Sequence, residues 1–587
     1  MSTVSAQSAE RRRRLVTRTL PISVLAASSF AVGLAVGDAN KLAAIERFAA
    51  AWEEGDFEAM HAELAPEAAS ATAPEELAAA YSEAAVTGTI ASVEAGEATQ
   101  GKTTDGADAG IVPVTASTLA WGRVEGEIAV PVEDGLVAWA PHLVFPGLAP
   151  GETLGRRTRA PERASILAAD GTPLAEGPAA ERSSPLGLSA SAVAGEVGEP
   201  RRPAREELDA AGFPETALTG LSGLELAFND RLDGQPSGQL LALPEGEDDP
   251  AFGRPLATAQ PVAGKPVRTT IDTDLQNAAV TALGDRYGGV AAVDASDGSV
   301  LALAGIALSA PQPPGSTFKI ITTAAALEDG LVTPSDPFPV ETAAVIEGRE
   351  VANAHDELCG GTFRESFAHS CNSVFAPLGV EVGAERLVSA AEDFGFNAPP
   401  ALYNEEVAAV VDPPQSTIPS AEEIGGDLDV GVSAIGQGEV LATPLQLASI
   451  AQTVAAGGMR SPTPITKDPD FLPATEPLRV MSEPTAQTLT ELMVAVITEG
   501  TGAAGAVPGA QVAGKTGTAE LGPKALEEGQ VLEEGEEPEQ EVDAWFTAFA
   551  PANDPRLAVA AMIVNADGDG GTVAAPIVSQ VLSAGLN

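Results

Sequence analysis

The chain has 587 residues, in which 83 aspartates and glutamates outnumber 32 lysines and arginines and give a formal net charge of −51. A surface this acidic repels phosphate backbones, so we exclude nucleic acid as a partner. Hydrophobic residues make up 44% of the chain, which is enough for ordinary cores, and the length predicts about four structural units. Two cysteines are too few for a disulfide-dense scaffold or a four-cysteine zinc module.

A basic tail and an apolar run open the chain. Four consecutive arginines begin at Arg11, and no charged residue occurs between Leu20 and Gly37. Because basic flanks stay in the cytoplasm, we expect a cytoplasmic tail over 1–18 and a single transmembrane signal anchor over 19–37. The catalytic part would then lie outside the cell membrane. A cleaved signal peptide is the alternative, since the run ends in small residues.

Residues 40–155 combine helical and strand patterns. Apolar residues repeat at helical spacing over 41–52, and a second short helix is expected over 57–64. Alternating strand-type runs follow at 110–115 and 126–132. Helices followed by a curved sheet predict a small α+β domain. This stretch resembles the nuclear-transport-factor-2-like (NTF2-like) domain at the N-terminus of some cell-wall transpeptidases.

Residues 156–266 are rich in proline, glycine and glutamate. A strand, a tight Asp-Gly turn and a second strand are predicted over 163–175, and a glycine-punctuated helix over 220–234. Both segments resemble the pedestal, or dimerisation-like, domain that precedes the catalytic domain of class B penicillin-binding proteins. That family usually has Arg-Gly where this chain has Arg163-Ala164, so the resemblance leaves the salt-bridging role of Arg163 open.

The first catalytic motif is Ser316-Thr-Phe-Lys319, which follows two prolines and a glycine. We expect a helix from Ser316 to about Glu328. The spacing of three places Ser316 and Lys319 on one helix face, so the lysine amine can take the proton of the serine nucleophile. The alternative is that Ser316 is only a helix cap and Lys319 a solvated side chain.

A second motif, Ser370-Cys371-Asn372, lies downstream in the order that such a site requires. The Ser370 hydroxyl can relay a proton between Lys319 and a leaving group. The Asn372 amide can bind a substrate carbonyl.

A third motif, Lys515-Thr-Gly-Thr518, follows a strand-type run. We expect Lys515 at a strand end, where its charge attracts a substrate carboxylate and lowers the pKa of Lys319. The hydroxyls of Thr516 and Thr518 suit carboxylate binding, and Gly517 lets a ligand backbone lie close to the strand.

Together the three motifs are a signature of serine β-lactamases and penicillin-binding proteins. Residues 267–587 resemble the transpeptidase domain of class B penicillin-binding proteins, and the resemblance extends to 269–276, 436–448 and 544–551. It implies an α+β multidomain chain whose catalytic domain is penicillin-binding/serine β-lactamase-like, with a five-stranded antiparallel sheet flanked by helices. The pedestal region shows no Glu-Asp pair of a glycosyltransferase, which favours a monofunctional enzyme.

The resemblance also implies an activity. Ser316 would attack the D-Ala-D-Ala end of a peptidoglycan stem peptide, release D-Ala and pass the acyl group to an amine of a neighbouring strand. The backbone N–H groups of Ser316 and Thr518 would form the oxyanion hole, and β-lactams would acylate the same serine. Besides these ligands and the cell membrane, cell-wall assembly proteins are expected partners, and no cofactor is expected.

Other functions remain as alternatives. A D,D-carboxypeptidase or a β-lactamase-like hydrolase would share the fold and differ in what resolves the acyl-enzyme. No glutamate motif for activating water is visible, which favours transfer. A non-enzymatic β-lactam sensor or an assembly scaffold is the third alternative, although 18 residues leave little room for cytoplasmic signalling.

The two cysteines and a glutamate-rich run are two further features of the chain. Cys359 and Cys371 form either a disulfide or two free thiols, and with His355 and His369 they have a loose zinc-ligand spacing. We expect no metal, because zinc would occupy the Ser370–Asn372 loop. The run between Lys524 and Asp543 is rich in glutamate and predicts a solvated loop between two strands, with a lid or docking role as the alternative.

Overall fold

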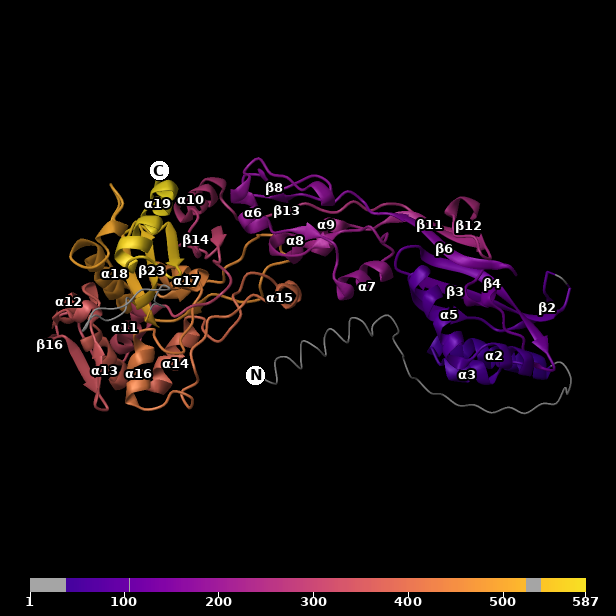
Figure 1. Cartoon of the computed structure of the whole chain (residues 1–587), viewed down its shortest axis with the longest axis horizontal. Helices are drawn as coiled ribbons and strands as arrows, with labels where there is room; N and C mark the ends of the chain where they lie inside the picture. Colours follow the sequence, from indigo (N-terminus) through magenta and orange to yellow (C-terminus); the bar gives the residue numbers. More distant parts are fainter. Residues whose placement is uncertain (1–38, 105, 524–539) are drawn as a thin grey trace, which may run out of the picture.

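The computed structural model describes residues 39–104, 106–523 and 540–587. The molecule is elongated, with an N-terminal helix–sheet region at one end, a narrow middle region, and a large C-terminal region at the other end (Figure 1). Among the described residues, no helix is both long and apolar enough to cross a membrane. The expected membrane anchor at 19–37 lies outside the described residues.

Four helices and an antiparallel sheet form the N-terminal region. The expected helices are present as α2 and α3, and the expected strands as β3 and β4. Two further helices were not predicted, because α5 contains five alanines and only three of its side chains are buried. The bounds are α2 (Ala39–Glu54), α3 (Phe57–Ala62), α4 (Pro66–Ala71), α5 (Pro74–Thr87), β1 (Ile90–Ala95), β2 (Thr99–Lys102), β3 (Asp108–Thr118), β4 (Gly122–Glu133) and β5 (Leu136–Val137).

The middle region is built from short elements. β7 and β8 are antiparallel and joined by the predicted Asp-Gly turn. The single helix predicted over 220–234 is wrong: α8 and α9 are separate helices, because Phe228 between them leaves helical geometry at φ −110°. The bounds are β6 (Glu152–Arg159), β7 (Ile166–Leu167), β8 (Pro173–Ala175), α6 (Leu188–Ala194), β9 (Val197–Gly198), α7 (Arg202–Ala210), β10 (Thr219–Gly220), α8 (Gly223–Ala227), α9 (Asn229–Asp233), β11 (Ser237–Pro244), β12 (Arg254–Ala259) and β13 (Val267–Arg268).

A buried ionic network holds the middle region together. Arg163 is 5% exposed and donates to Glu225 at 2.7 Å and to Asp233. Arg182 donates to the other carboxylate oxygen of Glu225 at 2.7 Å. Arg163 therefore forms salt bridges even though the residue after it is Ala164 rather than glycine. Its partners come from α8 and α9, not from the turn after β7.

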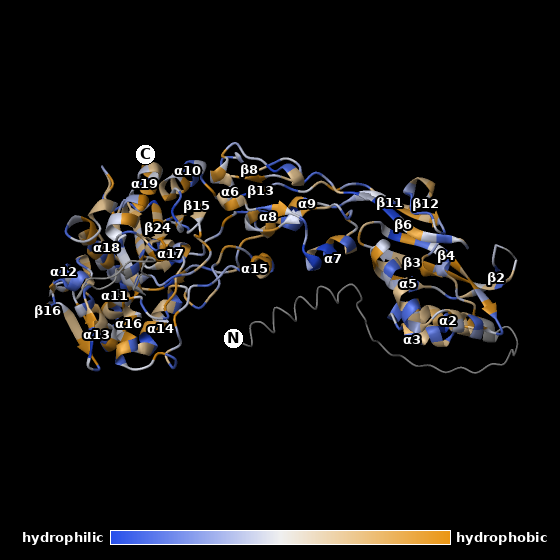
Figure 2. Ribbon diagram, viewed as in Figure 1, coloured by the Kyte–Doolittle hydropathy of each residue, from blue (hydrophilic) through white to orange (hydrophobic). Residues whose placement is uncertain are grey.

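A five-stranded antiparallel sheet organises the C-terminal region, as expected, in the order β15-β14-β24-β23-β22. Every residue of β24 is buried, and Figure 2 shows apolar colour along this strand, in contrast to the polar helix α7. The strand bounds are β14 (Gly288–Asp294), β15 (Val300–Gly305), β22 (Ala513–Pro523), β23 (Gln540–Ala550) and β24 (Leu557–Ile563).

Helices cover both faces of this sheet. α10 (Thr273–Leu283) and α19 (Ala575–Leu586) share one core with Phe546 and Val559 of the sheet. α17 (Pro444–Ala455) and α18 (Glu483–Thr498) share the other core with Trp545 and Ala560, next to α11 (Lys319–Glu328). The remaining elements are β16 (Pro337–Glu341), β17 (Ala343–Ile346), β18 (Arg349–Ala352), β19 (Cys359–Thr362), α12 (Phe363–Ala368), α13 (Asn372–Val382), α14 (Ala384–Asp393), α15 (Glu405–Val411), α16 (Asp427–Ala434), β20 (Met459–Arg460) and β21 (Leu478–Arg479).

The glutamate-rich segment before β23 falls mostly outside the described residues. β23 already begins at Gln540, so residues 540–543 belong to the sheet and not to the predicted loop. Lys515 is likewise the third residue of β22, inside the strand and not at its end.

Candidate active site

Ser316 lies on a single turn of 3-10 helix, η5 (Gly315–Phe318), that leads directly into α11. The sequence predicted one continuous α-helix, and the tighter first turn is the difference. Ser316 is half-buried, while Lys319 at the start of α11 is completely buried. The nucleophile candidate therefore reaches the surface, and the base candidate beneath it is shielded from water.

Gly315 fixes how closely this turn approaches the sheet. Its φ is +52°, and its N–H donates to the Gly436 carbonyl at 2.9 Å. A Cβ atom at this position would lie 2.5 Å from the Thr518 carbonyl oxygen on β22. Since real Cβ atoms do not come this close to a backbone oxygen, only glycine allows η5 to lie against β22.

Lys319 bonds to the second motif. Its Nζ lies 2.7 Å from the Ser370 carbonyl oxygen, 2.7 Å from Asn372 Oδ1 and 3.3 Å from Ser370 Oγ. The ring of Phe375 lies beneath the same ammonium group at 5.2 Å. The first and second motifs thus meet directly at the lysine.

Lys515 reaches the same hydroxyl from the sheet. Its Nζ donates to Ser370 Oγ at 2.9 Å and to the Thr516 carbonyl at 3.1 Å, and it is fully buried above the Phe367 ring. The Ser370 hydroxyl therefore lies between two lysines. This arrangement brings side chains from all three motifs together.

Burial lowers the basicity of both lysines. Burial, followed by the positive charge of Lys515, holds the pKa of Lys319 well below its usual range. Burial lowers the pKa of Lys515 to about 7. An amine near neutrality at physiological pH can accept a proton, which an ordinary surface lysine cannot do.

The Ser370 backbone is held in an uncommon conformation. Its φ is +62°, in the left-handed region that residues other than glycine rarely adopt. The next residue, Cys371, is the N-cap of α13 and is joined by a disulfide to Cys359 on β19, with a Cα–Cα distance of 5.3 Å. The disulfide ties this loop to β19, which pairs with β16. Because both sulfurs are in the bond, neither is a thiolate that could bind zinc.

The remaining predicted residues line β22. Thr516 Oγ1 lies 2.7 Å from Thr501 Oγ1, and Thr518 Oγ1 accepts from the Gly570 N–H at 3.4 Å. A Cβ atom at Gly517 would lie 2.6 Å from the Pro314 carbonyl oxygen. Gly517 thus serves the approach of η5, in addition to the ligand approach expected from the sequence.

Sequence reasoning missed several residues that shape the site. Thr501, Phe367 and Phe375 belong to no motif, and the fold alone brings the two phenylalanines to the lysines and Thr501 to Thr516. Gly315 had a signal, because it lies directly before the serine in the run Pro313-Pro-Gly-Ser. Within 39–104, 106–523 and 540–587, no group of three or more His, Cys, Asp or Glu side chains has the geometry of a metal site.

The fold and the three converging motifs define a serine-type acyl-transfer site. In agreement, residues 288–583 match the family described as penicillin binding protein transpeptidase domain. The chain belongs to this penicillin-binding protein transpeptidase family.

Relatives and solved structures agree with this assignment. The chain is 34% identical over 412 residues to the peptidoglycan D,D-transpeptidase PbpA of Mycolicibacterium smegmatis, which covers 59% of this chain and 78% of that protein. Penicillin-binding protein A from M. tuberculosis, solved as an imipenem acyl-enzyme complex, has a TM-score of 0.55 and 28% identity and covers 73% of this chain and 99% of that one. PBP2 of Pseudomonas aeruginosa, solved in complex with WCK 5153, has a TM-score of 0.59 and 25% identity, covering 73% and 96%.

Proposed function

We propose that the chain is a peptidoglycan D,D-transpeptidase that works through an acyl-enzyme on Ser316 and is acylated covalently by β-lactams. One observation carries this proposal: two fully buried lysines, Lys319 and Lys515, converge on the Ser370 hydroxyl. Lys319 lies one helical turn after Ser316, which is half-buried. The names of the relatives and the acyl-enzyme complex of a similar structure support it.

The contacts of Lys319 suit the role of base. A neutral amine has two N–H donors and one lone pair. The two shortest contacts, to the Ser370 carbonyl and Asn372 Oδ1, account for both donors. The lone pair then remains for the Ser316 hydroxyl proton, and the Ser316 Oγ–carbon bond forms as that proton moves to Lys319.

Ser370 suits the role of proton relay. As the bond to the leaving D-Ala nitrogen breaks, Lys319 returns its proton through the Ser370 hydroxyl to that nitrogen. Lys515 donates to Ser370 Oγ, which keeps this oxygen oriented, and its charge with the hydroxyls of Thr516 and Thr518 would hold the substrate carboxylate. Asn372 would bind a substrate carbonyl, and the N–H groups of Ser316 and Thr518 would form the oxyanion hole.

We extend the proposal to the other parts of the chain. Residues 1–18 would be a cytoplasmic tail and 19–37 a single-pass membrane anchor, which the basic flank and the apolar run support. Residues 40–155 would form an NTF2-like domain, 156–266 the pedestal, and 267–587 the transpeptidase domain. The elongated shape favours a role in which the N-terminal regions carry contacts to cell-wall assembly proteins while the distant C-terminal region performs the chemistry (Figure 1).

A stem-peptide donor ending in D-Ala-D-Ala, offered with and without an amine acceptor, tests this function. We expect release of D-Ala together with a new amide bond between donor and acceptor. Identification of the products by mass spectrometry distinguishes the alternatives: a shortened donor alone in the presence of acceptor would indicate a carboxypeptidase. Rapid turnover of a penicillin would indicate a β-lactamase. No turnover of either compound would indicate a sensor or scaffold.

A further inference from the structure

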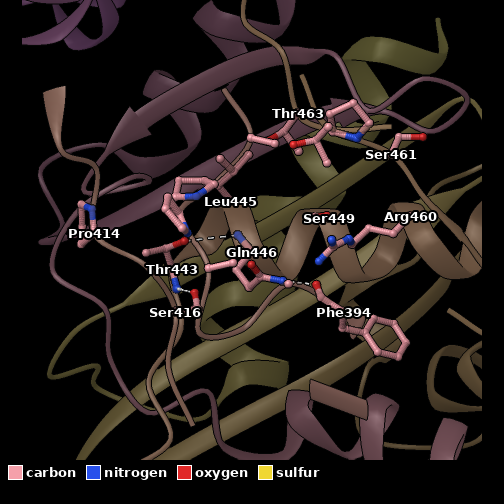
Figure 3. Close-up of a pocket in the computed structure, with 17 residues that line it drawn as sticks. Phe394, Pro414, Ser416, Thr443, Leu445, Gln446, Ser449, Arg460, Ser461 and Thr463 are labelled. Atoms are coloured by element: carbon pink, nitrogen blue, oxygen red, sulfur yellow. Dashed lines mark hydrogen bonds between the residues drawn. The ribbon is translucent and has the colours of Figure 1, made fainter. Parts of the chain in front are cut away.

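A second pocket lies in the C-terminal region away from the lysine cluster. It encloses about 200 Å³ between the first turns of α17, the segment that follows α14, and the residues after β20 (Figure 3). None of the proposed catalytic side chains lines it. Its lining includes Phe394, Leu445, Ser449, Arg460 and Thr463.

Arg460 in this pocket has an unusual environment for an arginine. In the described part of the chain, every other arginine that is buried or half-buried forms an ion pair with a carboxylate. The Arg460 guanidinium has no such ion pair there and no hydrogen bond within the described residues. The attraction of Asp393 acts on it only from beyond ion-pair distance, and burial lowers its pKa. The buried or half-buried arginines that form ion pairs are Arg156, Arg163, Arg182, Arg205, Arg231, Arg364 and Arg386.

The guanidinium lies close to Gly395 and Gln446. A Cβ atom on Gly395, whose φ is +105°, would lie 2.5 Å from Arg460 Nη1 and 3.4 Å from the Gln446 amide. Gln446 is fixed in turn, because its Nε2 donates to the Phe394 carbonyl at 2.7 Å. Figure 3 shows Arg460 extending across α17 toward Gln446. The glycine leaves room for a positioned cation at the pocket wall.

Hydroxyl groups and apolar walls surround this cation. Ser449 and Thr463 are 7% and 6% exposed, and neither hydroxyl has a hydrogen-bond partner within the described residues. Pro399, Pro414 and Leu445 supply apolar surface. A charged group, two available hydroxyls and apolar walls are the usual composition of a small-molecule site.

We propose that this pocket binds a small monocarboxylate, whose carboxylate pairs with Arg460 and accepts from the hydroxyls of Ser449 and Thr463. A single guanidinium balances one negative charge, and its planar fork matches a carboxylate in two parallel hydrogen bonds. The volume lies below the range of about 300–1,000 Å³ for drug-sized ligands, so the ligand is of the size of an acylated amino acid. The site is independent of the proposed transpeptidase activity.

Binding of N-acetylglycinate tests the proposal, with the neutral isostere N-acetylglycinamide as the matched probe. The full chain is held in lipid nanodiscs, and ligand-observed saturation-transfer NMR measures the dissociation constant of each probe. We expect saturable binding of the acid in the millimolar range and at least about tenfold weaker binding of the amide. Arg460→Gln should raise the dissociation constant of the acid by about tenfold or more.

Three controls keep the result interpretable. Arg202→Gln removes an exposed arginine far along the chain and should leave binding unchanged. Ser449→Ala tests the pocket without removing the charge, so it applies even if Arg460→Gln does not fold. This variant should raise the dissociation constant of the acid by a few-fold. Inorganic phosphate, added at the ionic strength of a chloride control, should not displace the acid.

Several outcomes would overturn the proposal. Equal binding of the acid by wild type and folded Arg460→Gln would place any binding elsewhere, including the catalytic cleft, which this variant leaves intact. Equal dissociation constants for the acid and the amide would show that the negative charge of the ligand does not contribute to binding, which contradicts its pairing with Arg460. Displacement of the acid by phosphate beyond that of the chloride control would contradict the carboxylate assignment. No saturable binding of the acid up to about 20 mM would contradict the site itself.

Discussion

Two of the seven lysines, Lys319 and Lys515, are completely buried, although the chain carries 83 acidic residues that could pair with lysines at the surface. Neither of them forms an ion pair with a carboxylate in the described structure. Both instead contact the Ser370 hydroxyl, at 3.3 and 2.9 Å. Burial without a counter-ion costs stability. It also lowers the pKa of Lys319, so that its neutral amine can accept the Ser316 hydroxyl proton.

The pKa shifts of the two lysines predict the pH dependence of acylation. Lys319 must be neutral, so the rate rises with pH through its lowered pKa. Lys515 must be charged, so the rate falls as pH rises through about 7. Lys515→Arg should lose the alkaline fall, because a guanidinium stays charged, at the cost of a lower maximum. Initial rates of fluorescent-penicillin labelling between about pH 5 and pH 9 measure both profiles. Identical alkaline limbs in the two proteins would contradict this account.

At the scale of elements, the site depends on how closely η5 approaches β22. Gly315 and Gly517 lie on the two sides of this contact: an added Cβ on Gly315 would meet the Thr518 carbonyl oxygen of β22, and one on Gly517 would meet the carbonyl oxygen of Pro314, the residue directly before η5. The disulfide between Cys359 and Cys371 links β19 to the start of α13. The catalytic groups are therefore positioned by main-chain contacts and one covalent bond, not by side-chain packing alone.

Gly315→Ala should therefore separate the serine from the sheet. The added methyl group would lie 2.5 Å from the Thr518 carbonyl, and the φ of +52° is unfavourable for alanine. We expect the second-order rate of penicillin acylation to fall by about 100-fold, because small displacements of reacting groups are this costly. Gly330→Ala is the matched control, since Gly330 has a φ of +68° and open space around it. A Gly315→Ala protein that labels as fast as Gly330→Ala would show that the contact is not needed.

At the scale of the whole molecule, the middle region connects the N-terminal and C-terminal regions, which lie at opposite ends (Figure 1). Its interior depends on the network of Arg163, Glu225 and Asp233. It meets the C-terminal region through Arg231, which pairs with Asp468 and lies over the Phe471 ring. Apolar side chains of the middle region, among them Ile166, Leu224 and Leu232, also share one buried core with the C-terminal region, so the connection combines apolar burial with these polar and aromatic contacts.

Arg163→Met should loosen the middle region. Removing one partner of a buried pair leaves the Asp233 carboxylate without its cation, which costs about 3–5 kcal/mol. Hydrogen exchange of the α8 and α9 amides should then accelerate by about two orders of magnitude or more. Arg202→Met removes a pair whose arginine side chain is 91% exposed and should leave these amides unchanged. Unchanged exchange in Arg163→Met would refute the structural role of the network.

The transpeptidase family and fold could be predicted from the sequence because the three motifs are short local patterns that occur in a fixed order. Ser316 and Lys319 are three residues apart. The positions of Lys515 on a strand and of Ser370 before a helix are fixed once the sheet and its covering helices form. The helices α4 and α5 were missed because alanine gives little contrast between buried and exposed faces.

Long-range contacts could not be predicted from the sequence in the same way. Arg163 forms its ion pair with Glu225 across 62 residues of chain. The space that the Arg460 guanidinium occupies depends on both Gly395 and α17. Neither contact leaves a local pattern. The break between α8 and α9 at Phe228 could not be predicted either, because it accompanies contacts of the Phe228 ring with Phe471 and Tyr403 of the C-terminal region, which are distant in sequence.

The central claim is that Ser316 is the nucleophile, and the intact mass of the protein after exposure to benzylpenicillin tests it most directly. Wild type should gain the mass of one penicilloyl group, and digestion should place it on the peptide that contains Ser316. Ser309→Ala, which changes an exposed serine in the loop before the site, should gain the same mass. Ser316→Ala should gain none. A full adduct on folded Ser316→Ala would contradict the account.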